Sequence, residues 1–258
     1  MSSDWQPPPF PDDVVTSWHD GPCGRMRSRS VGRPVEGMPE IALVQGLAVA
    51  DYLLPALGAL GEWTRAHLLD LPGLAGSGDP PHELSIEEYG AAVRDWIDAQ
   101  GRRFVVAGHS SGTQVASEAA AGNPAATGLV LASPTTDPLV RGPLRLTVAW
   151  QLDGRREPPG LTGSHVPEWR RAGPRRLWHL VGAQLRHDIE QPVSRTSVPV
   201  LVIRGRRDLI SRRRWARHLA GLVDDGAYVE VDGAHTFVWL DPGAWSAPIR
   251  SFAESCGR

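Results

Sequence analysis

The strongest constraint on the fold is a five-residue turn, Gly108-His109-Ser110-Ser111-Gly112, that lies between two contrasting segments. Residues 104–107 before it are apolar and β-prone, and the residues from 113 onward are mostly small, as in a closely packed helix. A serine at the tip of such a strand-to-helix turn is held in a strained conformation that exposes its hydroxyl. The flanking glycines let the strand and the helix approach each other. This context predicts a buried strand, a tight turn and a helix, with Ser110 as a candidate nucleophile.

Short apolar runs alternate with longer helical patterns along most of the chain. One helical pattern is preceded by Ser85, with Glu88 three residues later, which is a capping box. The alternation predicts a mostly parallel central sheet with helices on both faces, and a hairpin near 24–30 is expected to add antiparallel edge strands. Strands are expected at 41–44, 65–69, 104–107, 128–132, 200–203 and 227–231, and helices near 51–61, 86–99, 113–121, 212–223 and 241–254.

The alternation stops between residues 135 and 196, in a segment rich in Trp, Arg, Pro and Gly. This segment is too long for a loop, and helical stretches are expected near 141–152, 166–171 and 174–187. An α/β sheet keeps its ligand crevice outside the carboxyl ends of its strands, so we expect a small helical cap there, inserted after the sixth strand. The predicted organisation is a flexible proline-rich arm at 1–15, an α/β core at 16–134 and 197–258, and the cap at 135–196.

The charge pattern argues against several classes of partner. The 27 positive charges are all arginine, which leaves no lysine for Schiff-base chemistry, and the net charge is only −2. A nearly neutral chain has no field to attract nucleic acid, so the arginine-rich run at 204–217 is interpreted as a solvated helix face. No apolar stretch reaches the length of a membrane span.

The N-terminal residues and the cysteines bear on location. Residues 1–13 are proline-rich and acidic, unlike a secretory leader. Cys23 and Cys256 have no metal-ligand spacing and favour a reduced protein, although a bridge between them is left open. We therefore expect a cytoplasmic protein with a small-molecule substrate, without nucleic acid or a membrane as partner. The oligomeric state is not predicted.

A nucleophilic serine needs a base, and the base needs an acid that orients it. Asp208 follows the strand expected at 200–203, and His235 follows the strand expected at 227–231. This gives the chain order Ser, Asp, His that the strand-turn-helix nucleophile requires.

Two alternatives to these assignments remain open. Asp208 could instead pair with Arg206 or Arg207, with Asp137, after the preceding strand, as the acid. His109 is expected to pack or form hydrogen bonds behind the turn rather than to act in catalysis.

Several further motifs make the chain resemble the α/β-hydrolase superfamily, specifically its capped, single-domain, esterase-like bacterial serine hydrolases. The resemblance covers residues from about 26 to 253. Residues 45–48 stand where such proteins carry His-Gly-x-x, residues 70–77 resemble their D-x-P-G-x-G-x-S turn, and 205–208 and 233–235 resemble their acid and base loops. The chain departs from this pattern at two positions, with Gln45 where a histidine is usual and Ala75 where a glycine is usual. Both departures affect the expected shape of the oxyanion loop.

The resemblance implies an enzyme that cleaves a carboxylic ester or lactone of a small apolar substrate through an acyl-enzyme at Ser110. His235 would be the base and Asp208 the acid, and the backbone N–H groups of Leu47 and Ser111 would form the oxyanion hole. No metal and no organic cofactor is implied. A serine nucleophile argues against the epoxide hydrolase and haloalkane dehalogenase branches, which need a carboxylate.

The substrate pocket and the reaction subtype are less constrained. Three tryptophans of the expected cap are candidates for substrate binding: Trp150, Trp169 and Trp178. Thioester or C–C bond hydrolysis would use the same three catalytic residues. A non-hydrolytic catalyst or a binding protein of small-molecule biosynthesis on the same fold is the alternative from another class.

Overall fold

A computed structural model describes residues 8–157 and 160–257 of the chain. Within this part, strands and helices alternate as the sequence predicts. The strands are β1 (Val15–Gly21), β2 (Gly24–Val31), β3 (Glu40–Val44), β4 (Ala66–Asp70), β5 (Phe104–His109), β6 (Ala126–Ala132), β7 (Val200–Gly205) and β8 (Gly226–Val231). The helices are a 3-10 turn (Asp51–Leu53), α1 (Leu54–Gly61), α2 (Ile86–Gln100), α3 (Gly112–Ala120), α4 (Pro143–Gly154), α5 (Leu161–Arg186), α6 (Glu190–Arg195), α7 (Arg213–Ala220), α8 (Phe237–Leu240) and α9 (Pro242–Cys256).

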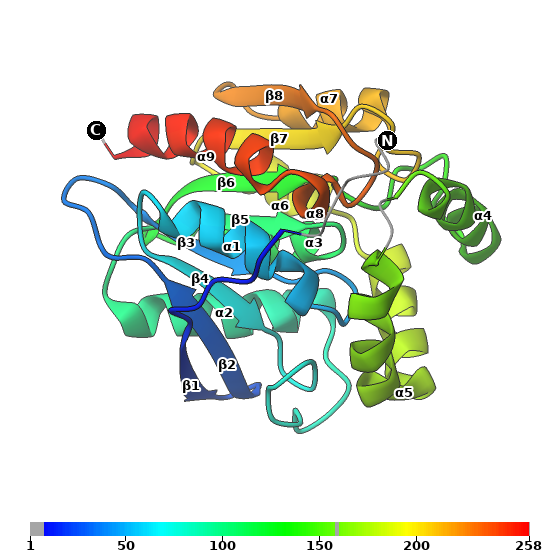
Figure 1. The fold of residues 1–258 in the computed structure, drawn as a ribbon, viewed down its shortest axis with the longest axis horizontal. Coiled ribbons are helices and arrows are strands. Elements are labelled where there is room, and N and C mark those ends of the chain that lie inside the picture. The colour runs from blue at the N-terminus through cyan, green and yellow to red at the C-terminus, as the bar shows by residue number, and fades with distance from the viewer. Residues whose placement is uncertain (1–7, 158–159, 258) are drawn as a thin grey trace.

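The described strands form one sheet in the order β1-β2-β4-β3-β5-β6-β7-β8 (Figure 1). Neighbours from β4 across to β8 pair in parallel, whereas β1 with β2 and β2 with β4 pair antiparallel. The predicted parallel sheet and its antiparallel edge strands are confirmed. The hairpin begins earlier than predicted, because Gly24–Val31 is one strand of it and Val15–Gly21 is the other. The parallel strands end at one edge of the sheet, and the loops that follow β5, β7 and β8 carry the three predicted catalytic side chains.

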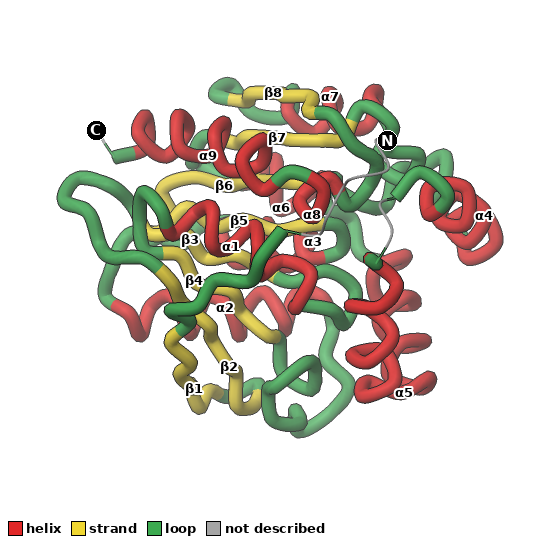
Figure 2. The backbone as a smooth tube through the Cα atoms, in the orientation of Figure 1, coloured by secondary structure: helices red, strands yellow, loops and turns green. Residues whose placement is uncertain are grey.

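Helices cover both faces of the sheet (Figure 2). Successive residues of β5 point to opposite faces, as a strand requires: Phe104 and Val106 pack with α2, α3 and α7, whereas Val105 and Ala107 pack with α1 and α9. The predicted capping box begins α2, since the Glu88 N–H donates to Ser85 Oγ (3.2 Å) and the Ser85 N–H donates to Glu88 Oε2 (2.7 Å). The core therefore consists of two apolar layers, one on each side of β5.

Two helices inserted between β6 and β7, α4 and α5, lie beside the carboxyl ends of the strands (Figure 1), where the sequence predicted a cap. We call α4 and α5 the cap helices. Gly173 breaks α5 with φ 78° and ψ 159°. The following helix, α6, packs against α3, and its Val193 belongs to the core. The division of the chain into arm, core and cap units stays a prediction.

Three expectations from the sequence concern the chain ends and the cysteines. Residues 1–7 of the predicted arm lie outside the described residues, while Phe10 packs edge-on against Trp239, with ring centroids 6.4 Å apart. Cys23 and Cys256 are both free thiols. Of the helices in the described part of the chain, none combines the length and the apolar character needed to cross a membrane.

Candidate active site

The turn after β5 holds Ser110 at φ 55°, in the left-handed region that side chains other than glycine rarely adopt. Its flanking glycines are sterically required. A Cβ on Gly108 would lie 2.3 Å from the Gly112 carbonyl oxygen, and a Cβ on Gly112 would lie 2.3 Å from the Gln45 carbonyl oxygen. The close approach of β5, α3 and the loop after β3 therefore forces the backbone that presents the Ser110 hydroxyl.

The structure brings Ser110, His235 and Asp208 together from three loops. Ser110 Oγ lies 2.7 Å from His235 Nε2, and His235 Nδ1 lies 3.0 Å from Asp208 Oδ2. Both are hydrogen-bond distances. A linear hydroxyl–imidazole–carboxylate array of this kind can transfer a proton from the serine to the ring.

The Asp208 carboxylate is completely enclosed and fixed by its own loop. Its Oδ1 accepts the backbone N–H groups of Ile210 and Ser211, each at 2.8 Å. Burial raises the pKa of Asp208, but His235 and the hydrogen bonds lower it by more, so the net pKa lies below its ordinary value. Asp208 is therefore held as a carboxylate against the ring.

The alternatives considered for the acid do not match this geometry. Arg206 lies near Asp232, at 3.8 Å, instead of pairing with Asp208. The Asp137 carboxylate is buried and accepts the backbone N–H of Leu139 at 2.9 Å, in the loop after β6. The carboxylate on the His235 ring is that of Asp208.

His235 is buried among acidic groups. Burial lowers its pKa, but the carboxylates of Asp208, Asp153 and Glu157 together raise it by more, to about 9. The three carboxylates thus stabilise the protonated form of the ring, which is the form that His235 takes once it has accepted a proton.

His109 lies behind the turn, as predicted. Its Nδ1 is 2.6 Å from the Tyr52 hydroxyl, and its Nε2–H donates to the His235 carbonyl oxygen at 2.9 Å. Burial, with a contribution from His235, lowers the pKa of His109 to about 3. A neutral His109 therefore links the 3-10 turn to the base loop without adding charge.

Leu47 and Ser111 lie where the sequence placed the oxyanion hole. Leu47 lines the same cavity as Ser110, and both Leu47 and Ser111 border an adjoining void of about 10 Å³. Gln45, at the position where a histidine was expected, is fully buried, and its amide has no hydrogen-bond partner among the described residues. The use of the Leu47 and Ser111 N–H groups as oxyanion donors stays a prediction.

A cavity of about 300 Å³ opens over Ser110 and His235. All three predicted tryptophans line it, Trp169 half-buried and Trp178 mostly exposed. The other apolar side chains of its wall are Leu47, Val49, Pro143, Leu146, Val181 and Ile210. The cavity can therefore hold an apolar group next to the hydroxyl.

Several residues of the site carry no sequence signal. Asp153 and Glu157 reach the base loop from the region of α4, and Glu168 reaches the loop after β3 from α5. Their partners lie 56 to 118 residues away in sequence, and no motif joins them. Only an amphipathic analysis that found acidic residues on the inner face of the cap helices could have indicated them.

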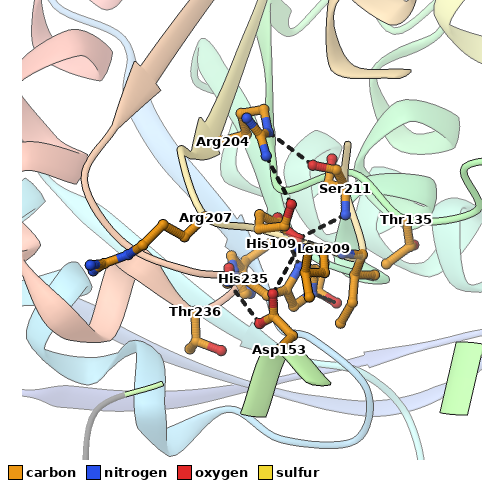
Figure 3. A network of polar contacts seen from close by, with 12 residues as sticks. His109, Thr135, Asp153, Arg204, Arg207, Leu209, Ser211, His235 and Thr236 are labelled. Atoms are coloured by element: carbon orange, nitrogen blue, oxygen red, sulfur yellow. Dashed lines mark hydrogen bonds and ion pairs between the residues drawn. The ribbon is translucent and has the colours of Figure 1, made fainter. Parts of the chain in front are cut away.

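Arg204 corrects the interpretation of the arginine-rich run as a solvated face. Its side chain is buried, because its Nε–H donates to the Ser211 carbonyl and an Nη2–H donates to the Asp208 carbonyl, both at 2.9 Å (Figure 3). It also pairs with Glu230. Arg204 therefore fixes the acid loop from behind.

A possible metal site lies elsewhere in the described part of the chain. Glu87, Glu118 and His187 offer ligand atoms within 4.8 Å of one another. The His187 ring is already engaged, with Nε2 2.9 Å from Glu118 and Nδ1 3.1 Å from the Gln114 amide. None of the three lines the cavity over Ser110.

The sequence matches the family described as the Alpha/beta hydrolase family over residues 43–248. This match covers most of the chain, and the sheet order, the turn after β5 and the loops after β7 and β8 agree with it. The chain belongs to the α/β-hydrolase family and has its fold. No curated protein matches it in sequence.

Solved structures of hydrolases share the fold at low sequence identity. A hydrolase from Pseudomonas aeruginosa PA01 is 22% identical, with a TM-score of 0.72 over 93% of this chain and 98% of its own. The N-acyl homoserine lactonase AidH, complexed with N-butanoyl homoserine, is 20% identical, with a TM-score of 0.74 over 94% and 97%. A thermophilic esterase from Thermogutta terrifontis is 18% identical, with a TM-score of 0.72 over 95% and 100%.

Proposed function

We propose that this protein is a serine hydrolase that cleaves a carboxylic ester or lactone of a small apolar substrate through an acyl-enzyme at Ser110. The observation that carries the proposal is the continuous array from Ser110 Oγ through the His235 ring to Asp208, with contacts of 2.7 and 3.0 Å. A buried hydroxyl–imidazole–carboxylate array that opens into a cavity is the arrangement that acyl transfer needs.

In the proposed reaction, His235 Nε2 takes the Ser110 proton as Oγ attacks the substrate carbonyl carbon. The oxyanion that forms would be stabilised by the Leu47 and Ser111 N–H groups, each contributing about 3 kcal/mol if they behave as such donors do elsewhere. His235 then protonates the departing alkoxide, which leaves the acyl group on Ser110. Water, deprotonated by the same ring, releases the acid and restores Ser110, while Asp208 stabilises the imidazolium in both steps.

The walls of the cavity support an apolar substrate. Trp150, Trp169 and Trp178 supply broad apolar surface. The polar side chains that line the cavity besides Ser110 and His235 are Tyr52, His109, Thr135, Thr147, His165, Gln184 and Thr236. The neighbours named above include a lactonase and an esterase, which agrees with cleavage of a lactone or an ester, although at 18–20% identity they share the fold alone. The mechanism needs no metal or organic cofactor, and a cytoplasmic location stays a prediction.

The test is the hydrolysis of p-nitrophenyl butanoate and of a simple γ-lactone by the purified chain. We expect turnover of at least one of them, and we expect Ser110→Ala to lower kcat at least about a thousandfold, since removing the nucleophile of such an array removes most of its catalysis. Ser194→Ala, at an exposed position of α6, is the matched control and should leave kcat unchanged. Turnover of thioesters alone would shift the proposal to a thioesterase, and ligand binding without turnover of any acyl compound would contradict it.

A further inference from the structure

The cap helices and the residues between them contain three acidic side chains, Asp153, Glu157 and Glu168, beside eight arginines at positions 143–186. In the described part of the chain, no arginine forms an ion pair with any of the three. Instead, each accepts backbone N–H groups from a loop at the candidate active site. These carboxylates are therefore oriented inward, towards the catalytic loops.

Asp153 makes the most direct of these contacts. Its Oδ1 accepts the Leu209 N–H at 2.8 Å, and its Oδ2 accepts the His235 N–H at 3.0 Å (Figure 3). The residue is only 1% exposed. Leu209 follows Asp208 directly in the chain, so a single carboxylate joins the acid loop to the base loop.

This bridge is a second link between the two loops. The first link is the Asp208–His235 hydrogen bond itself, which a small shift of either loop would break. Asp153 itself is buried, and it satisfies both backbone N–H groups, one with each carboxylate oxygen. The distance between the acid and the base is therefore set from the cap as well as from the sheet.

Glu157 lies beside Asp153 and also binds the base loop. The Thr236 N–H donates to its Oε1 at 2.7 Å. Burial and the neighbouring Asp153 carboxylate raise the pKa of Glu157 to about 8, against the opposing effect of the Thr236 N–H. Asp153 and Glu157 thus bind two successive N–H groups of the base loop, those of His235 and Thr236.

We propose that Asp153 is a positioning residue, whose carboxylate clamps the loop of Asp208 to the loop of His235 and so keeps the imidazole aligned with Ser110. The inference rests on the proposed function, because the alignment matters only if His235 acts as the base. It assigns to α4 a part in catalysis that neither the family match nor the sequence motifs indicate.

The charged and titratable groups around His235 determine how the loss of the Asp153 charge would change the pKa of His235. The acidic groups are Asp208 from the loop after β7, and Asp153 and Glu157 from the cap. The remaining neighbours are His109 and His165, whose pKa values burial lowers to about 3 and about 4, so both are neutral. Removing the Asp153 charge should therefore lower the pKa of His235.

The experiment measures the second-order rate constant for labelling of Ser110 by a fluorophosphonate, as a function of pH. Asp153→Asn keeps the side-chain size but leaves only one acceptor oxygen, so we expect the rate to fall at least tenfold. Asp137→Asn is the matched control, because Asp137 is also a buried aspartate that accepts a backbone N–H but does not contact His235. Its rate should stay within twofold of the wild-type rate.

A role in positioning is separated from a merely structural one by the pH profile. Glu157→Gln and the double variant Asp153→Asn/Glu157→Gln differ only at residue 153, which is a carboxylate in the first and a neutral amide in the second. In the plot of labelling rate against pH, the acid limb is the range in which the rate falls as His235 becomes protonated. We expect this limb to lie about one pH unit lower in the double variant than in Glu157→Gln. A lower rate with an unmoved limb would show that Asp153 only supports the fold and would overturn the proposal.

Two further outcomes keep the inference distinct from the proposed function. A wild-type chain that is not labelled refutes the hydrolase proposal itself, whereas a labelled wild type with an equally reactive, folded Asp153→Asn refutes only the clamp. If Asp153→Asn does not fold, amide hydrogen exchange in the wild-type protein tests the same contacts. Slow exchange at both the Leu209 and His235 amides supports the clamp, and fast exchange at either one overturns it.

Discussion

At the scale of single residues, the site depends on a strained serine. Ser110 has φ 55°, a conformation that costs roughly 1–2 kcal/mol for a residue with a Cβ. Its N–H donates to the Ala132 carbonyl at 2.9 Å, and its own carbonyl accepts the Thr113 hydroxyl at 2.5 Å. These bonds hold the turn in place, so the hydroxyl is presented to His235 before any substrate arrives.

The pKa of His235 gives a prediction for the pH dependence of the reaction. The neutral ring must accept the Ser110 proton, so kcat/KM should rise tenfold per pH unit below the pKa of His235 and level off above it. Burial lowers this pKa less than the three carboxylates raise it. The rising limb of the kcat/KM profile should therefore end well above pH 6.5, the ordinary pKa of a histidine side chain. Ester hydrolysis measured from pH 5 to 10 checks the sign.

Asp208→Asn is the informative variant for the same measurement. Without the Asp208 charge the limb should move to lower pH, and the plateau should fall by about ten-thousandfold, because the ring loses the partner that fixes its tautomer. A wild-type limb at or below pH 6.5 would contradict this account of His235.

At the scale of elements, α5 supports the proposed oxyanion loop. Glu168 accepts the Asp51 N–H at 2.9 Å and the Ala50 N–H at 3.1 Å, and the Trp169 indole N–H donates to the Leu47 carbonyl at 3.0 Å. Burial raises the pKa of Glu168 to about 6, against the lowering effect of these N–H groups. The helix therefore fixes the loop at two points, both on the carboxyl side of the Leu47 N–H.

Trp169→Phe tests this support, because it removes the indole N–H and keeps a smaller aromatic ring in the cavity wall. We expect kcat to fall about fivefold to tenfold, equivalent to one neutral hydrogen bond of about 1 kcal/mol, with KM nearly unchanged. Trp18→Phe, on the exposed edge strand β1, is the control and should leave both constants as they are. A rise in KM at constant kcat would mean that Trp169 acts through substrate binding alone.

The elements of the site differ in how far the sequence could predict them. The strands, the turn at Ser110 and the acid and base loops were predictable, because buried runs and turn glycines are encoded locally. Asp153 and Glu168 were not, since each accepts backbone N–H groups of a segment far away in the sequence. The burial of Arg204 was not predictable either. Arginine is usually found at the surface, and Arg204 can be buried because the carbonyl oxygens of Ser211 and Asp208 accept its N–H groups.

At the scale of the whole molecule, the cap helices and the strand ends enclose the reaction site between them. The loops at the strand ends carry the three candidate catalytic side chains, and the cap helices with the residues between them carry tryptophans and inward carboxylates. The sequence predicted where this cap belongs, but its contacts with the catalytic loops depend on packing across the chain. The cavity of about 300 Å³ is at the lower end of typical small-molecule sites.

The size of this cavity predicts the acyl preference. Across p-nitrophenyl esters from acetate upward, kcat/KM should rise about fourfold per methylene, the factor that corresponds to about 0.8 kcal/mol per buried CH₂, and then fall for chains that no longer fit. Trp150→Ala, which enlarges the wall, should move the maximum to a longer chain. A flat series, or a maximum at palmitate in the wild type, would contradict an apolar pocket of this volume.

The most direct test of the central claim is the intact mass of the chain after reaction with a fluorophosphonate, followed by peptide mapping. The account predicts one adduct per chain, on Ser110, absent in Ser110→Ala and formed at least about a thousandfold more slowly in His235→Ala. An adduct on any other residue, or an undiminished rate in His235→Ala, would contradict the claim that His235 makes the Ser110 hydroxyl a nucleophile.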